Sequence, residues 1–181
     1  MNKLLSAGLA GLLTLTLALP AAAHTGHADG TGFLAGFLHP LGGLDHLLAM
    51  VAVGLWAAQT GGRALWMLPV AFVTMLTAGA LIGMGGFELP MVEAGIAASV
   101  AVLGLLVVLN KRVSVYAGMA LVGVFAVFHG HAHGAEMPAA AAPVLFGAGF
   151  ILSTVLLHGA GIATMLIGRG VAKRLARPTA A

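Results

Sequence analysis

Long apolar stretches separated by short polar connections dominate the pattern along this chain. A helix needs about 20 mostly apolar residues to cross the hydrocarbon core of a bilayer. Beyond the first 23 residues, the apolar stretches predict an all-α, polytopic membrane bundle of about five spanning helices, at residues 33–58, 64–85, 91–109, 113–130 and 143–167. The connections are too short for a water-exposed domain, so residues 24–181 are expected to form a single transmembrane domain.

The first 23 residues have the pattern of a secretory signal peptide. Lys3 provides a positive start, residues 4–19 are apolar, and three alanines at 21–23 suit cleavage. The alternative is an uncleaved first transmembrane helix, and in both cases His24 is expected outside the cytoplasm. His24 and His27 are candidates for collecting metal there, although short polar tails often contain histidine.

Composition excludes several classes of protein. Of 181 residues, 60% are hydrophobic and 7% are charged, whereas a soluble domain has about 25% charged residues. An ordinary soluble enzyme is therefore excluded, and a net charge of +3 is too small for a nucleic-acid-binding face. The absence of cysteine excludes disulfides, thiolate metal sites and a cysteine nucleophile. The eight histidines outnumber the five acids.

The charged residues predict an orientation in the membrane. If the spans alternate, every basic residue falls on one side, which is the cytoplasmic side by the positive-inside rule. These residues are Lys3, Arg63, Lys111, Arg112, Arg169, Lys173, Arg174 and Arg177. Most acids fall on the other side, so we expect the N-terminus outside and the C-terminus inside the cytoplasm.

Polar residues inside the first span are the strongest indication of function. An aspartate near the centre of a membrane helix costs about 2.5–3.5 kcal/mol, yet Asp45 lies there beside His46. In a continuous helix at 100° per residue, His39, His46 and Met50 share one stripe, with Asp45 on its flank. We interpret His39, Asp45 and His46 as metal ligands and Met50 as a weaker candidate. The alternative is a buried hydrogen-bonded cluster that only fixes helix packing.

The same span is expected to be broken or kinked. Pro40 cannot donate a backbone hydrogen bond, and Gly42 and Gly43 weaken the next turn. Irregular backbone at membrane depth is tolerated where it is buried in protein or lines a wet cavity. Interrupted helices recur at ion sites in transporters.

A second group of histidines follows the fourth span. If this segment is helical, His129, His133 and Glu136 lie at i, i+4 and i+7 and share one face. Two histidines at i and i+4 can bind one cation, so these three residues form a second predicted ligand set. His131 would point elsewhere unless the glycines unwind the helix. The alternative is an exposed histidine-rich loop.

Two further residues are weaker candidates for the metal pathway. His158 lies near the middle of the last span, on a stripe of small and polar residues. Its alternative role is that of a core histidine bonded to a neighbouring group. Glu93 begins the third span, where a solvated carboxylate is the alternative.

The donor set indicates the class of ion. Imidazole and carboxylate without thiolate suit Ni²⁺, Co²⁺ and Zn²⁺, and less well Mn²⁺ or Fe²⁺. Since imidazole binds metal only when neutral, binding should weaken as pH falls through the ordinary histidine range near 6.5. The chain has no phosphate-binding loop, so transport would be passive, or coupled to another ion or to trapping inside.

Other classes of function use the same histidines. A membrane metalloprotein or haem protein would hold them as fixed ligands, although the sequence has neither an H-E-x-x-H helix nor a Glu-x-x-His pair. A metal-sensing or scaffold subunit would bind the ion without translocating it. A transporter that is not an enzyme and has no prosthetic group is our leading hypothesis.

The two histidine motifs also resemble those of a known family. The segment 39–46 closely resembles the first-helix motif of the HupE/UreJ nickel permeases, and the segment 128–136 is similar to their second motif. The resemblance covers essentially the whole chain. It implies high-affinity uptake of Ni²⁺, with Co²⁺ as an alternative substrate, across the bacterial cytoplasmic membrane. It assigns the main transport role to His39, Asp45 and His46, and a second role to His129, His133 and Glu136.

The resemblance also implies partners. Permeases of this family accompany hydrogenase and urease maturation, so the metal would be delivered to a nickel enzyme or its chaperone inside the cell. The other expected partners are the divalent ion and the lipid bilayer, and several copies of the chain could assemble together.

Overall fold

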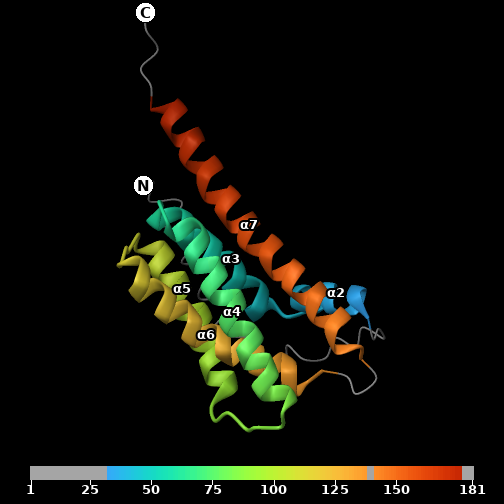
Figure 1. Ribbon diagram of the computed structural model, residues 1–181. Helices are drawn as coiled ribbons and strands as arrows, with labels where there is room; N and C mark the ends of the chain where they lie inside the picture. Colours follow the sequence, from blue (N-terminus) through green and yellow to red (C-terminus); the bar gives the residue numbers. More distant parts are fainter. Residues whose placement is uncertain (1–31, 138–140, 177–181) are drawn as a thin grey trace, which may run out of the picture.

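The computed structural model describes residues 32–137 and 141–176, which are helical apart from short connections. The signal-peptide prediction, His24 and His27 lie outside these ranges. Figure 1 shows the helices side by side, with α7 running along the edge of the others. The helices are α2 (Phe33–Gly42), α3 (Leu44–Thr60), α4 (Ala64–Met84), α5 (Val92–Val108), α6 (Val115–Ala135) and α7 (Pro143–Leu175).

The predicted all-helical membrane bundle is confirmed, including the break in its first span. Helices α4, α6 and α7 are each long and apolar enough to cross a membrane, and α2 with α3 passes the same test as a pair. The axes of this pair differ by 87°, so the continuous stripe expected from His39 to Met50 does not exist. Helix α5, with 17 residues, lies at the lower limit for a spanning helix.

Two helices extend further than the apolar pattern indicates. Helix α6 continues to Ala135 and α7 to Leu175, beyond the expected ends at 130 and 167. In α6 the extension includes His131 and His133, which therefore lie on a helix and not in a loop. Apolar length marks where lipid contact ends, whereas backbone hydrogen bonding continues past that point.

The helix ends show which helices run in the same direction. The indole Nε1 of Trp56, near the end of α3, donates to the carbonyl of Lys111 just after α5, at 2.8 Å. Arg169, near the end of α7, donates to the carbonyl of Ala58 at the end of α3, at 2.8 Å. Helices α3, α5 and α7 therefore run in the same direction, and α4 and α6 run the opposite way.

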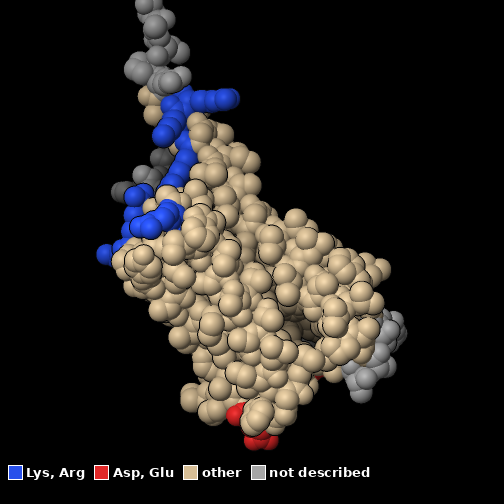
Figure 2. All heavy atoms as spheres, in the orientation of Figure 1, with Lys and Arg blue, Asp and Glu red and all other residues tan. Residues whose placement is uncertain are grey.

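Charged residues gather at opposite ends of the bundle. Figure 2 shows the lysine and arginine side chains at the end where α3, α5 and α7 finish, and acidic side chains at the other end. We call the end with the lysine and arginine side chains the basic end. The opposite end, where α6 finishes with His129 and His133, is the histidine end. Between them the visible surface is uncharged, as expected for a face in contact with lipid.

Helices α4 and α6 form the most extensive helix–helix contact, through glycines spaced four residues apart. A Cβ added at Gly79 or Gly83 would collide with the α6 backbone, and one added at Gly130 or Gly134 would collide with the α4 backbone. Small residues at this spacing let membrane helices approach closely. The glycines of the second histidine motif therefore hold α6 against α4.

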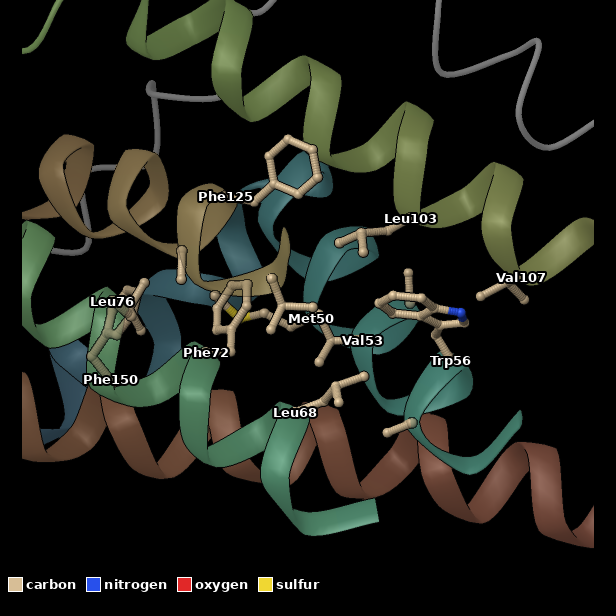
Figure 3. Packing of buried hydrophobic residues seen from close by; sticks show 14 of the residues in the cluster. Met50, Val53, Trp56, Leu68, Phe72, Leu76, Leu103, Val107, Phe125 and Phe150 are labelled. Atoms are coloured by element: carbon tan, nitrogen blue, oxygen red, sulfur yellow. The ribbon is translucent and has the colours of Figure 1, made fainter. Parts of the chain in front are cut away.

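Toward the basic end, the apolar core is built around Trp56. Figure 3 shows Trp56 of α3 between the α5 residues Leu103 and Val107 on one side and Leu68 of α4 on the other. Trp56, Leu68 and Leu103 are almost completely buried. Met50 is also completely buried in this apolar core, which makes it part of the packing.

Candidate metal site

The break at Gly43 positions the first histidine motif. Gly43 has an extended backbone (φ −104°, ψ 118°) and separates His39 near the end of α2 from His46 in the first turn of α3. Pro40 weakens the end of α2 because it lacks a backbone donor. Asp45 lies in the first turn of α3, where the helix dipole favours a negative charge.

Asp45 and His46 form a close pair. The Asp45 Oδ1 atom lies 3.0 Å from Nδ1 of His46 and also accepts the His46 backbone N–H at 2.8 Å. An ionised carboxylate can only accept, so Nδ1 of His46 donates the proton in this contact. The lone pair of the neutral ring then belongs to Nε2. A Cβ at Gly43 would lie 3.0 Å from Oδ1 and 3.2 Å from Nδ1, so glycine leaves room for this pair.

The second histidine motif completes a cluster. His129 and His133 are buried in the last two turns of α6. The ring centroid of His133 lies 4.1 Å from that of His46 and 4.8 Å from that of His39. The ring centroids of His46 and His129 are 4.6 Å apart. We call His39, His46, His129 and His133 the histidine cluster.

Aromatic rings enclose this cluster. Phe146 of α7 lies 5.5 Å from His39, and Phe150, one turn later, lies 4.3 Å from His133, measured between ring centroids. Phe72 of α4 lies 6.0 Å from His129. The imidazoles are therefore surrounded by an apolar wall, in which an electrostatic interaction is stronger than in water.

The cluster is not arranged as a completed coordination sphere. In the described ranges, no three His, Asp or Glu side chains are positioned to hold one metal ion. The rings of His46 and His129 meet edge to face, at 89°, and so contact each other through ring atoms. In this arrangement the ring nitrogens of His46 and His129 do not converge on one point.

The other residues of the second motif lie outside the cluster. His131 is buried on α6, and its Nε2 lies 2.7 Å from the carbonyl oxygen of Phe87 in the α4–α5 connection. Glu136 follows the last residue of α6 and is exposed. His129 and His133 both lie beside His46, whereas Glu136 lies at the exposed end of α6. Glu93 is likewise exposed, in the first turn of α5.

His158 occupies a separate, deeper position on α7. It is 1% exposed, and among the described residues neither ring nitrogen has a hydrogen-bond partner. A Cβ at Gly54 of α3 would collide with the His158 carbonyl, so His158 lies about two turns beyond His46 along α3. The Phe72 ring contacts His158 edge-on at 5.1 Å. Phe72 therefore lies between the cluster and His158.

Several residues around the cluster were not identified from the sequence. Phe72, Phe146 and Phe150 look like ordinary apolar residues of membrane helices. Ser99 of α5, whose Oγ lies 2.7 Å from Nε2 of His129, is one small polar residue in an apolar helix. The spacing of Gly79 with Gly83, and of Gly130 with Gly134, is a recognisable sequence signal and could have predicted the α4–α6 contact.

A cavity of about 330 Å³ reaches the cluster from the side. It lies between α4, α6 and α7, and the hollow is visible between the lower parts of α4 and α7 in Figure 2. Apolar residues such as Leu81, Val144 and Phe150 line most of it. His133 is the one titratable side chain among the described residues that line this cavity.

These features define a class: a polytopic membrane protein with imidazoles buried in a helix bundle at a broken span. Comparison with known proteins supports a narrower assignment. A model of the HupE / UreJ protein family matches residues 12–181. The chain is similar to Protein HupE of Rhizobium leguminosarum bv. viciae, at 48% identity over 158 residues, which cover 84% of this chain and 82% of the relative. This chain belongs to the HupE/UreJ family. No solved structure matches it.

Proposed function

We propose that this protein is a transporter that carries Ni²⁺, with Co²⁺ as an alternative substrate, inward across the cytoplasmic membrane. The observation that carries the proposal is the meeting of His39 and His46 with His129 and His133 inside an apolar bundle. Imidazole donors without thiolate suit these ions. The HupE/UreJ family is associated with accessory functions of nickel-containing hydrogenase and urease, which supports nickel as the substrate.

The distribution of charge supports the direction. If the basic end faces the cytoplasm, then α2 begins outside, α7 ends inside, and the histidine cluster lies in the outer half of the membrane. The ion would reach the cluster from outside and pass Phe72 toward His158, two turns closer to the basic end. A nickel enzyme or its chaperone would receive it inside.

A transport role accounts for the buried histidines better than an enzymatic one. The sequence has neither an H-E-x-x-H helix nor a Glu-x-x-His pair, the ligand patterns of common metalloenzymes. A carrier site must bind its ion and also release it. We therefore propose that the chain is not an enzyme, that its metal is a substrate, and that no prosthetic group is needed.

Uptake of radioactive nickel by cells expressing the chain tests this proposal. Asp45→Asn removes the carboxylate charge beside His46, and His46→Ala removes a ring of the cluster. Both variants should reduce uptake to background. His131→Gln is the matched control, because its side-chain amide can still donate to the Phe87 carbonyl. Undiminished uptake in both site variants would disprove the assigned site.

A second experiment separates transport from binding. Purified protein in liposomes should admit Ni²⁺, and competing Co²⁺ should reduce the rate more than competing Zn²⁺ does. Binding without entry would instead indicate a sensing or scaffold subunit. A haem Soret band in the visible spectrum of the protein would overturn the transport proposal in favour of a haem protein.

A further inference from the structure

Helix α5 contributes one polar side chain to the surroundings of the cluster. Ser99 is completely buried, and its Oγ lies 2.7 Å from Nε2 of His129 and 2.6 Å from the carbonyl oxygen of Ile96. A hydroxyl group has one proton and two lone pairs. These two contacts therefore determine where the protons lie.

The Ile96 contact fixes the hydroxyl proton. A carbonyl oxygen can only accept, and two oxygen atoms 2.6 Å apart repel each other unless a proton lies between them. The Ser99 hydroxyl therefore donates to Ile96. Toward His129 the hydroxyl oxygen can then only accept a hydrogen bond. The short contact to Nε2 therefore requires His129 to carry its proton on Nε2.

This proton position determines which nitrogen of His129 can bind a metal. A neutral imidazole has one N–H, so the lone pair is on Nδ1. Nδ1 of His129 is buried and has no hydrogen-bond partner among the described residues. We propose that Ser99 is a positioning residue that holds His129 as the Nε2–H tautomer, so that His129 binds the transported cation through Nδ1. The metal-binding part of this inference rests on the proposed function.

His46 has the opposite arrangement. Its Nδ1 donates to Asp45, which leaves Nε2 as its donor atom toward metal. Metal-binding histidines usually donate their second ring N–H to a carboxylate or a carbonyl, and this orients the ring. Asp45 does so directly for His46, while Ser99 connects His129 to the Ile96 carbonyl. The two neighbouring rings thus present different nitrogens to the metal. His46, held by the charged Asp45, presents Nε2, and His129, held by the neutral Ser99, presents Nδ1.

Nitrogen NMR of the metal-free protein tests the tautomer directly. In ¹⁵N-histidine-labelled protein in lipid nanodiscs, with His129 assigned through its backbone, the Nε2 resonance of His129 should be of the protonated type and the Nδ1 resonance of the unprotonated type. The reverse pattern would overturn the inference. This measurement uses the wild-type chain and does not depend on any transport activity.

Two isosteric variants test the role of Ser99. Ser99→Thr keeps the hydroxyl and adds a methyl group, and Ser99→Val has a second methyl group in place of that hydroxyl, so the two variants have the same shape. Ser99→Thr should keep the Nε2–H tautomer and an apparent nickel affinity close to that of the wild type. Ser99→Val should lose the tautomer preference and weaken the affinity by about 10–100-fold, the usual effect of removing a residue that supports a ligand.

The outcomes separate this inference from the proposed function. If Ser99→Val keeps both the tautomer and the affinity, Ser99 has no positioning role and the inference is wrong. If the tautomer changes as expected while neither Ser99→Val nor His46→Ala affects nickel uptake, the tautomer assignment stands and the transport site is wrong. If neither variant folds, the wild-type spectrum still decides the tautomer.

Discussion

The two ends of the bundle use buried polar groups in different ways. At the basic end each of three polar side chains donates to a backbone carbonyl: Trp56 to Lys111, Gln59 to Val107 at 2.9 Å, and Arg169 to Ala58. These bonds join the ends of α3, α5 and α7. Hydrogen bonding of this kind is typical of buried polar groups that stabilise a fold.

At the histidine end His131 likewise contacts a backbone carbonyl, that of Phe87, but the rings of the histidine cluster pack against one another and against aromatic rings. Nδ1 of His129 has no hydrogen-bond partner among the described residues. A buried polar atom in this state costs about 1–3 kcal/mol. Gln59 Oε1 at the basic end is in the same state, but the Gln59 amide group also joins α3 to α5 through its bond to Val107. The comparison indicates that the basic end mainly supplies stability and the histidine end mainly supplies binding. The following substitutions test this division.

The largest expected effect is that of His133→Ala. His133 contacts both His39 and His46, so its loss should reduce nickel uptake to background, while the free energy of unfolding should fall by less than in Trp56→Ala because the buried ring removed is smaller. Uptake and unfolding in detergent should be measured on the same preparations, normalised to the amount of protein in the membrane. Uptake at the wild-type rate would show that the cluster does not carry the ion.

Trp56→Ala should have the converse effect at the basic end. It leaves a cavity beside Leu68 and Leu103 and removes the bond to Lys111, so the free energy of unfolding should fall by about 3–5 kcal/mol. Nickel uptake per folded molecule should stay unchanged. A loss of uptake in the folded fraction would contradict the division between the two ends.

Gly130→Ala should lower both the stability and the nickel uptake, because Gly130 packs against α4 and lies between His129 and His133. Its added Cβ would collide with the Leu76 carbonyl of α4 and displace the turn between His129 and His133. We expect a loss of about 1–3 kcal/mol in stability together with reduced uptake. Gly168→Ala on α7, where an added Cβ meets nothing within 4 Å, is the matched control and should lower neither.

The smallest expected effect is that of Gln59→Leu. It removes the donor to the Val107 carbonyl, worth about 1 kcal/mol. It also removes Oε1, a buried atom without a hydrogen-bond partner in the described part of the chain, and so recovers part of the loss. The temperature of thermal unfolding should fall only slightly. A large drop would show that this contact is central to the assembly of α3 with α5.

The sequence was sufficient to predict the helical class and the broken first span. Apolar length and the pair Pro40 and Gly43 are local properties, so they can be read without knowledge of the partners. The same local approach failed for the stripe from His39 to Met50. That prediction assumed one continuous helix, whereas α2 and α3 meet at an 87° bend. His39 lies beside the cluster because the chain bends after α2.

The composition of the site was less predictable. His129 and His133 share a helical face by spacing alone, but only the folded bundle, in which α6 packs mainly against α4, places them beside His46. Ser99 had no sequence signal, because a single serine acquires its role from the 2.7 Å contact to His129. Glu136 fitted the spacing, yet α6 ends before it, at Ala135.

Helix α7 is longer than the membrane it is expected to cross. Its 33 residues extend for about 50 Å, against a hydrocarbon thickness of about 30 Å, and Figure 1 shows its last turns beyond the other helices. Arg169 fixes it to the end of α3, while Phe146 and Phe150, at its opposite end, touch the histidine cluster. One helix thus places Phe146 and Phe150 beside the imidazoles and, at its other end, carries Lys173 and Arg174 beyond the other described helices.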